Sequence, residues 1–179
     1  MQPESPEPSD SRTGRDESIV TMLRMFYVSA AYAEAAFGHM LSAYQGLTAD
    51  QRLKVEALRR LTEESSDRIR KALRESWNVD VDRPKRAGEM AVLIADQPIG
   101  TWHDRMVRLE DICVRGVESF RVLRQLYGQR APELCATLLA KQMAMRDFAR
   151  LELDGEGANS MAMLLRLLSP GAREDLAAA

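Results

Sequence analysis

Residues that could carry chemistry are few in this chain, and they are scattered. His39 and His103 are the two histidines, and Cys113 and Cys135 are the two cysteines. The sequence contains no Cys-x-x-Cys pair, no Glu-x-x-His pair, no Gly-rich phosphate loop and no Gly-x-Ser-x-Gly elbow. A nucleophilic cysteine needs a nearby base and a lowered pKa, which the spacing does not provide. We therefore expect both cysteines to pack as small hydrophobic residues, and we identify no catalytic residue.

The pair His103-Asp104 allows two interpretations. It could act as an acid/base pair next to Trp102. Alternatively, Thr101 and Asp104 have the spacing of a capping box, in which the acid serves the N-terminus of a helix and its dipole. We favour the cap, because an aspartate in the first turn of a helix more often has that role.

Charge patterning excludes several classes of function. Basic residues between positions 52 and 74 alternate with acids at helical spacing, and the whole chain has a net charge of −2, so we expect no nucleic-acid partner. Arg83, Lys85 and Arg86 form a small basic patch that could contact an anion. No apolar run approaches the roughly 20 residues of a membrane span, and the N-terminus does not read as a secretory signal, so we expect a cytoplasmic protein without a membrane partner.

Hydrophobic periodicity predicts an all-α fold. Apolar residues make up 45% of the chain, while the 10 glycines and 7 prolines are too few for a turn-rich β fold. Helices are expected over residues 17–44, 49–77, 102–127 and 132–153, with a short C-terminal helix that begins at 159 or 160 and ends at 168. Thr48 with Gln51 and Thr101 with Asp104 give N-terminal signals, Gly128 a stop and Pro132 a start.

The domain organisation follows from these elements. Residues 1–16 are expected to be a disordered tail, residues 17–168 a single helical-bundle domain, and residues 169–179 a frayed C-terminus. Short turns join the first and second pairs of long helices, whereas a longer connection, with a short helix over 86–94, joins the two pairs. This layout predicts a four-helix bundle with one long crossover.

Small and polar residues occupy the middle of the predicted inward faces. They leave space for a second helix or for a bound molecule between the helices. The candidate ligand-binding residues at the bundle centre are Ser29, Ala33, Thr62, Ser65, Cys113, Gly116, Gln142 and Met145.

The two helix pairs, the long central connection and the segment Thr101-Trp102-His103-Asp104 opening the third long helix resemble the ferritin-like superfamily. Active members of that family hold two irons, using one carboxylate from each of two helices and a Glu-x-x-His pair from each of the other two. At the matching inward positions this chain has Thr62, Ser65, Gln142 and Met145, so the expected metal ligands are missing. If the helices were rotated, Glu34, Glu64 and Glu110 could form a carboxylate cluster.

Two functional hypotheses follow from this comparison. The favoured one is a non-catalytic, ferritin-like bundle without a cofactor that acts in assembly or in binding a protein partner or ligand. The alternative is a diiron oxidoreductase or oxygenase with atypical ligands, for which iron is the cofactor. Second apolar stripes, with Val107 and Val114 on one helix and Leu139 and Met143 on the next, need a further surface to cover them. They lead us to expect a homodimer.

Overall fold

The computed structural model describes residues 10–87, 89 and 101–178. The described residues form helices and contain no strand, so the all-α prediction is confirmed. Four long helices, α1 (Asp10–Ala43), α2 (Ala49–Trp77), α4 (Trp102–Tyr127) and α5 (Pro132–Leu153), are followed by two short ones, α6 (Gly157–Leu165) and α7 (Pro170–Ala177). The bounds predicted for α4 and α5 are confirmed, and most of the helix predicted over 86–94 lies outside the described residues.

Local capping chemistry sets the helix ends. Thr48 with Gln51 and Thr101 with Asp104 both form capping boxes, as predicted. The second box places Asp104 in hydrogen bonds with Thr101, which hold the pKa of Asp104 below its ordinary value. The position therefore has the capping role rather than an acid/base role. At the end of α2, Asn78 takes the left-handed conformation (φ 52°) that asparagine tolerates.

Both ends of the expected domain need correction. The tail was expected to reach residue 16, but α1 begins at Asp10, and Asp16 forms an ion pair with Arg130. The C-terminus was expected to fray after residue 168, but α7 forms there. Ser169 caps its N-terminus, Pro170 occupies the first turn, and Leu176 is buried against the core. The short helix before it runs from Gly157 to Leu165 rather than from 159 or 160 to 168.

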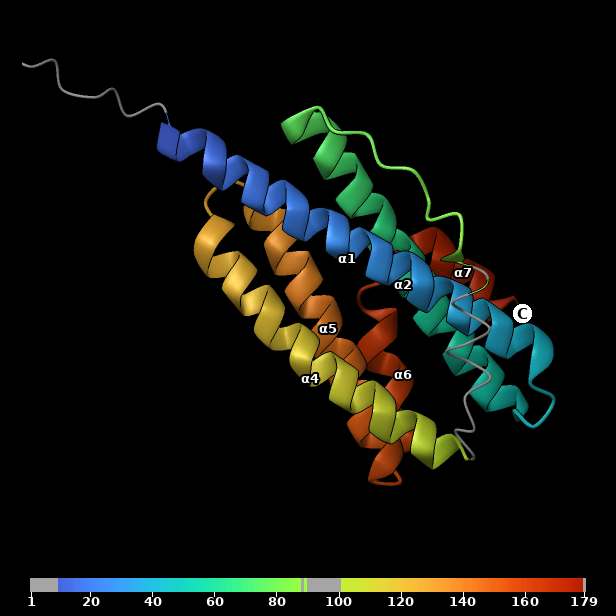
Figure 1. The fold of residues 1–179 in the computed structure, drawn as a ribbon. Helices are drawn as coiled ribbons and strands as arrows, with labels where there is room; N and C mark the ends of the chain where they lie inside the picture. The colour runs from blue at the N-terminus through green and yellow to red at the C-terminus, as the bar shows by residue number, and fades with distance from the viewer. Residues whose placement is uncertain (1–9, 88, 90–100, 179) are drawn as a thin grey trace, which may run out of the picture.

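The long helices form two hairpins, α1 with α2 and α4 with α5, that pack face to face (Figure 1). Between the hairpins, the closest approach of long helices is that of α2 to α5, while α1 and α4 have little or no close backbone contact. Helices α6 and α7 lie against α2 at the side away from α1 (Figure 1). None of the helices in the described part has both the length and the apolar character that a bilayer span requires.

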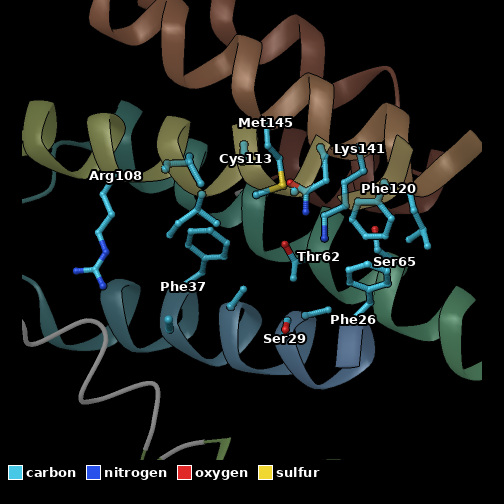
Figure 2. Close-up of a pocket in the computed structure, with 18 of the residues that line it drawn as sticks. Phe26, Ser29, Phe37, Thr62, Ser65, Arg108, Cys113, Phe120, Lys141 and Met145 are labelled. Carbon is cyan, nitrogen blue, oxygen red and sulfur yellow. The ribbon is translucent and has the colours of Figure 1, made fainter. Parts of the chain in front are cut away.

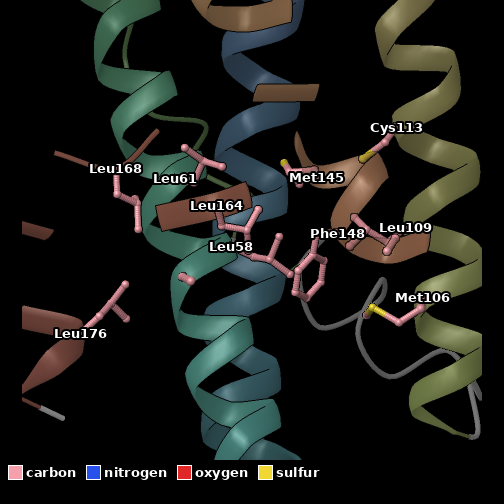
Figure 3. Packing of buried hydrophobic residues seen from close by; sticks show 12 residues of the cluster. Leu58, Leu61, Met106, Leu109, Cys113, Met145, Phe148, Leu164, Leu168 and Leu176 are labelled. Carbon is pink, nitrogen blue, oxygen red and sulfur yellow. The ribbon is translucent and has the colours of Figure 1, made fainter. Parts of the chain in front are cut away.

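The core consists of two hydrophobic clusters. One joins α2, α4, α5, α6 and α7, with Phe148 and Leu164 fully buried inside it (Figure 3). The other joins the four long helices, and its largest fully buried residues include Ile19, Leu23 and Leu138. Side chains from both clusters line the space between them, which is where the candidate site lies.

Candidate ligand cavity

A cavity of about 330 Å³ lies at the centre of the four long helices. Figure 2 shows side chains from α1 on one side facing side chains from α2, α4 and α5 on the other. Its lining is mostly apolar and includes residues of both core clusters, among them Leu109, Cys113, Phe120 and Leu138. Ser29 and Ile112 line it but are exposed, so the cavity opens to solvent between α1 and α4.

The structure brings together all eight residues proposed for the bundle centre. The residues of this set that line the cavity are Ser29, Ala33, Thr62, Ser65, Cys113, Gly116, Gln142 and Met145. They differ in burial, because Thr62, Ser65, Cys113 and Met145 are buried whereas Ser29 stands at the mouth. Their convergence on one cavity fits the expectation that small residues here leave space between helices.

The middle of α1 contributes small side chains to the cavity, between Phe26 and Phe37, which line it as well. Ala30, Ala33 and Ala36 line this side of the cavity, and none of them fills the gap between the two helices. The larger residues Ile19, Leu23 and Tyr27 are buried elsewhere on α1, within the second core cluster. The central part of α1 therefore borders a cavity instead of packing closely against α4.

The buried hydroxyl groups are satisfied within their own helix. Thr62 Oγ1 donates a hydrogen bond to the carbonyl of Leu58 (2.8 Å), and Ser65 Oγ donates to that of Leu61 (2.7 Å). Each hydroxyl oxygen keeps lone pairs that can still accept a hydrogen bond.

Gln142 is less well satisfied. Its Oε1 is buried and has no hydrogen-bond partner among the described residues. The carboxamide lies against Gly116, where a Cβ atom would be only 2.9 Å from Gln142 Cδ. Glycine at position 116 thus allows this amide to reach the cavity wall between α4 and α5.

The sequence interpretation missed Lys141, which is the most unusual residue of the site. Lys141 is 6% exposed, lines the cavity and points its ammonium group into it (Figure 2). No hydrogen bond or ion pair joins it to any residue in the described ranges. Burial lowers the pKa of Lys141 to about 8, although the electrostatic interaction with Cys113 opposes this shift.

A second buried lysine shows how such a charge is normally accommodated. Lys54 Nζ lies 2.6 Å from Asp50 and 2.8 Å from Glu152. Burial acts to lower the pKa of Lys54, but the hydrogen bonds to the two carboxylates outweigh it, and the net shift is upward. Glu152 also accepts hydrogen bonds from Trp102 (2.8 Å) and Ser160 (2.5 Å). The network joins α2, α4, α5 and α6, and its carboxylates neutralise the charge of Lys54.

The cavity lining is positive. Its charged side chains are Arg105 and Arg108 from α4 and Lys141 from α5. No carboxylate of the described residues lines the cavity. The guanidinium of Arg105 stacks 4.5 Å from the centre of the Tyr44 ring, while its Nε is buried without a hydrogen-bond partner.

The three alternative carboxylates do not come together. Glu34 is buried, but it does not line the cavity, and it pairs with Arg83 at 2.8 Å. Glu64 accepts hydrogen bonds from the backbone of Ser169, and Glu110 pairs with Arg150 at 3.1 Å. In the described ranges, no three His, Cys, Asp or Glu side chains are grouped so that they could hold a metal ion.

The two cysteines have the environment of packing residues. Burial raises the pKa of Cys113 to about 12, and it raises the pKa of Cys135 as well. Both thiols are therefore protonated near neutral pH, and neither is an activated nucleophile.

A spacing in the sequence could have revealed Lys141. Leu138, Lys141, Met145 and Phe148 follow one another at intervals of three, four and three residues, and all four are buried. A lysine inside such an apolar stripe signals a buried charge. Comparisons with protein-family models, with curated proteins and with solved structures found no match.

Proposed function

We propose that this protein binds a small, mainly apolar molecule in the cavity between α1, α2, α4 and α5. One observation carries the proposal: the apolar cavity at the core contains the buried side chain of Lys141, which has no partner among the described residues. Apolar cavities of several hundred Å³ with a few converging polar groups are the usual form of small-molecule sites. A buried ammonium without a partner costs free energy of folding, and a bound molecule can offset that cost.

We also propose that the fold is a ferritin-like four-helix bundle with a non-catalytic role. The two helix hairpins and the longer connection between them support this description. The inward Thr62, Ser65, Gln142 and Met145 supply neither carboxylate nor imidazole, which favours a binding role over diiron chemistry.

A homodimer remains our proposed assembly. Val107, Val114 and Met143 are exposed, which supports an apolar contact surface on α4 and α5. Leu139, expected in the same stripe, is instead buried in the second core cluster and contributes nothing to that surface.

Occupation of the cavity can be tested by filling it. Ala33→Leu places three more carbon atoms in the cavity, while Ala136→Leu makes the same change at an exposed position of α5. We expect isothermal titration with octanamide, a neutral molecule with an apolar chain, to detect binding to the wild type and to Ala136→Leu. Ala33→Leu should bind several times more weakly at an unchanged unfolding midpoint. Equal binding by Ala33→Leu and Ala136→Leu would place the ligand elsewhere and overturn the proposal.

A further inference from the structure

We propose that the molecule bound in this cavity carries a carboxylate, which pairs with the ammonium group of Lys141 while its apolar chain fills the rest of the cavity. This inference rests on the proposed function and specifies the class of ligand: a monocarboxylate with an unbranched or lightly branched apolar body. It requires no chemical step, only binding.

The charges around the cavity favour an anion. No charged residue that the structure describes in α1 or α2 lines the cavity. The ionisable residues that line it are Arg105, Arg108 and Cys113 of α4 and Lys141 of α5. Arg146 acts on Cys113 from the same helix as Lys141, but it does not line the cavity and it pairs with Asp147 at 2.6 Å. Among the described residues, every charged side chain that lines the cavity is therefore cationic. A neutral ligand would leave the ammonium unpaired, and a cationic ligand would add repulsion in a site of low dielectric constant.

Lys141 is the group best placed to receive the carboxylate. Its side chain is buried, points into the cavity and has no partner among the described residues, whereas the guanidinium of Arg105 is already stacked on Tyr44. Gln142 follows it in the sequence and lines the same cavity, with an amide oxygen that lacks a partner. The oxygen and nitrogen of the Gln142 amide are similar in size, so turning the amide over would present its NH₂ group to a carboxylate.

The volume of the cavity limits the apolar part of the ligand. A water molecule occupies about 30 Å³ in the liquid, and a methylene group is of similar size, so 330 Å³ accommodates roughly ten such groups. Octanoate has this size. Phe26, Phe37, Ile69 and Leu138 provide the surface against which its chain would pack.

Binding of a carboxylate is expected to be coupled to protonation of Lys141. The free protein loses the Lys141 proton near pH 8, and only the ammonium form offers a charge to the ligand. The other ionisable lining group, Cys113, stays protonated until about pH 12, and the two arginines remain charged throughout. Affinity for a carboxylate should therefore fall by up to about tenfold per pH unit above pH 8, while affinity for a neutral ligand stays constant.

The experiment compares octanoate with octanamide, which has the same length but no charge, by isothermal titration at pH 7 and pH 9.5. Three proteins are used: the wild type, Lys141→Met, and Lys71→Met, which removes an exposed lysine and makes the same change of charge. If the ammonium of Lys141 forms a charged hydrogen bond with the carboxylate, the wild type and Lys71→Met should bind octanoate at least about tenfold more tightly than octanamide at pH 7. Lys141→Met should lose this preference and still bind octanamide, and the wild-type preference should shrink at pH 9.5.

The possible failures can be told apart. If octanamide binds but octanoate has no advantage at pH 7, the carboxylate assignment is wrong, while the proposed function stands. If the advantage survives in Lys141→Met or does not change with pH, the anion is held elsewhere and the assignment to Lys141 is wrong. If neither molecule binds the wild type, the proposed function fails and this inference fails with it.

Discussion

Replacement of Lys141 by methionine should stabilise the ligand-free protein, and the gain should depend on pH. The side chain of Lys141 is buried and its ammonium has no partner in the described structure, and methionine has a similar length without the charge. Removing the charge therefore removes a cost of folding that the native packing does not repay.

The magnitude follows from the pKa of this side chain. Burial lowers the pKa of Lys141 to about 8 from the ordinary value of 10.5, so the unfolded chain binds the proton more tightly than the folded protein does. The free energy of unfolding consequently rises with pH between about 8 and 10.5. This difference between the pKa values of the folded and unfolded states lowers the free energy of unfolding by roughly 3 kcal/mol at pH 7 and by about 1 kcal/mol at pH 10, relative to a protein without the charge at position 141.

The assay is chemical denaturation of the wild type and Lys141→Met at pH 7 and pH 10, after refolding from guanidinium to remove bound molecules. The difference between the two proteins isolates Lys141 from other groups that titrate in this range. We expect the variant to be more stable by roughly 3 kcal/mol at pH 7, and we expect this advantage to shrink by about 2 kcal/mol at pH 10. Lys71→Met, at a side chain with 68% exposure, should change little at either pH. A variant that is less stable at pH 7, with a difference independent of pH, would mean that Lys141 has a partner and would refute the reasoning.

Four other outcomes are expected. Glu152→Gln should cost about 3 kcal/mol in denaturation because it removes one carboxylate from a buried lysine, whereas Glu75→Gln, whose lysine is exposed, should cost almost nothing. Gly116→Ala should cost less than about 1 kcal/mol, because the atoms that its Cβ meets are the end of the flexible Gln142 side chain and because alanine is favoured over glycine inside a helix by about 1 kcal/mol; in the Gln142→Ala background the same change should stabilise the protein by about 1 kcal/mol, and an equal effect in both backgrounds would contradict the close approach. Leu176→Ala should lower the free energy of unfolding by about 2 kcal/mol if α7 is part of the core, while a cost no larger than that of Leu126→Ala, at an exposed position, would mean that α7 contributes nothing. Light scattering should detect a dimer at micromolar concentration that Val107→Lys with Val114→Lys dissociates; a monomeric wild type would count against the proposed assembly.

The local sequence predicts much of the fold because helix boundaries depend on neighbouring residues. Thr48 and Thr101 fix two helix starts through side chains three residues away, and Gly128 and Pro132 delimit the turn between α4 and α5. The same periodicity placed all eight candidate residues around one cavity, since positions three and four apart share a face of a helix. Leu176 at the C-terminus was missed because one short helix has little periodicity of its own and is stabilised by the core that it joins.

The tertiary structure alone decided what that shared face does. Whether the alanines of α1 pack against α4 or border an open space depends on the distance between two helices that are far apart in the chain, and periodicity holds no information on that distance. Whether a buried lysine has a partner also depends on which helices pack together. Lys54 and Lys141 are both lysines within helices, yet Lys54 pairs with Glu152 from another helix, while Lys141 has no ion pair with any of the described residues. The sequence by itself determines the helices and the face on which each residue lies. The packing of the two hairpins determines which buried charge has a partner and which one remains available to a ligand.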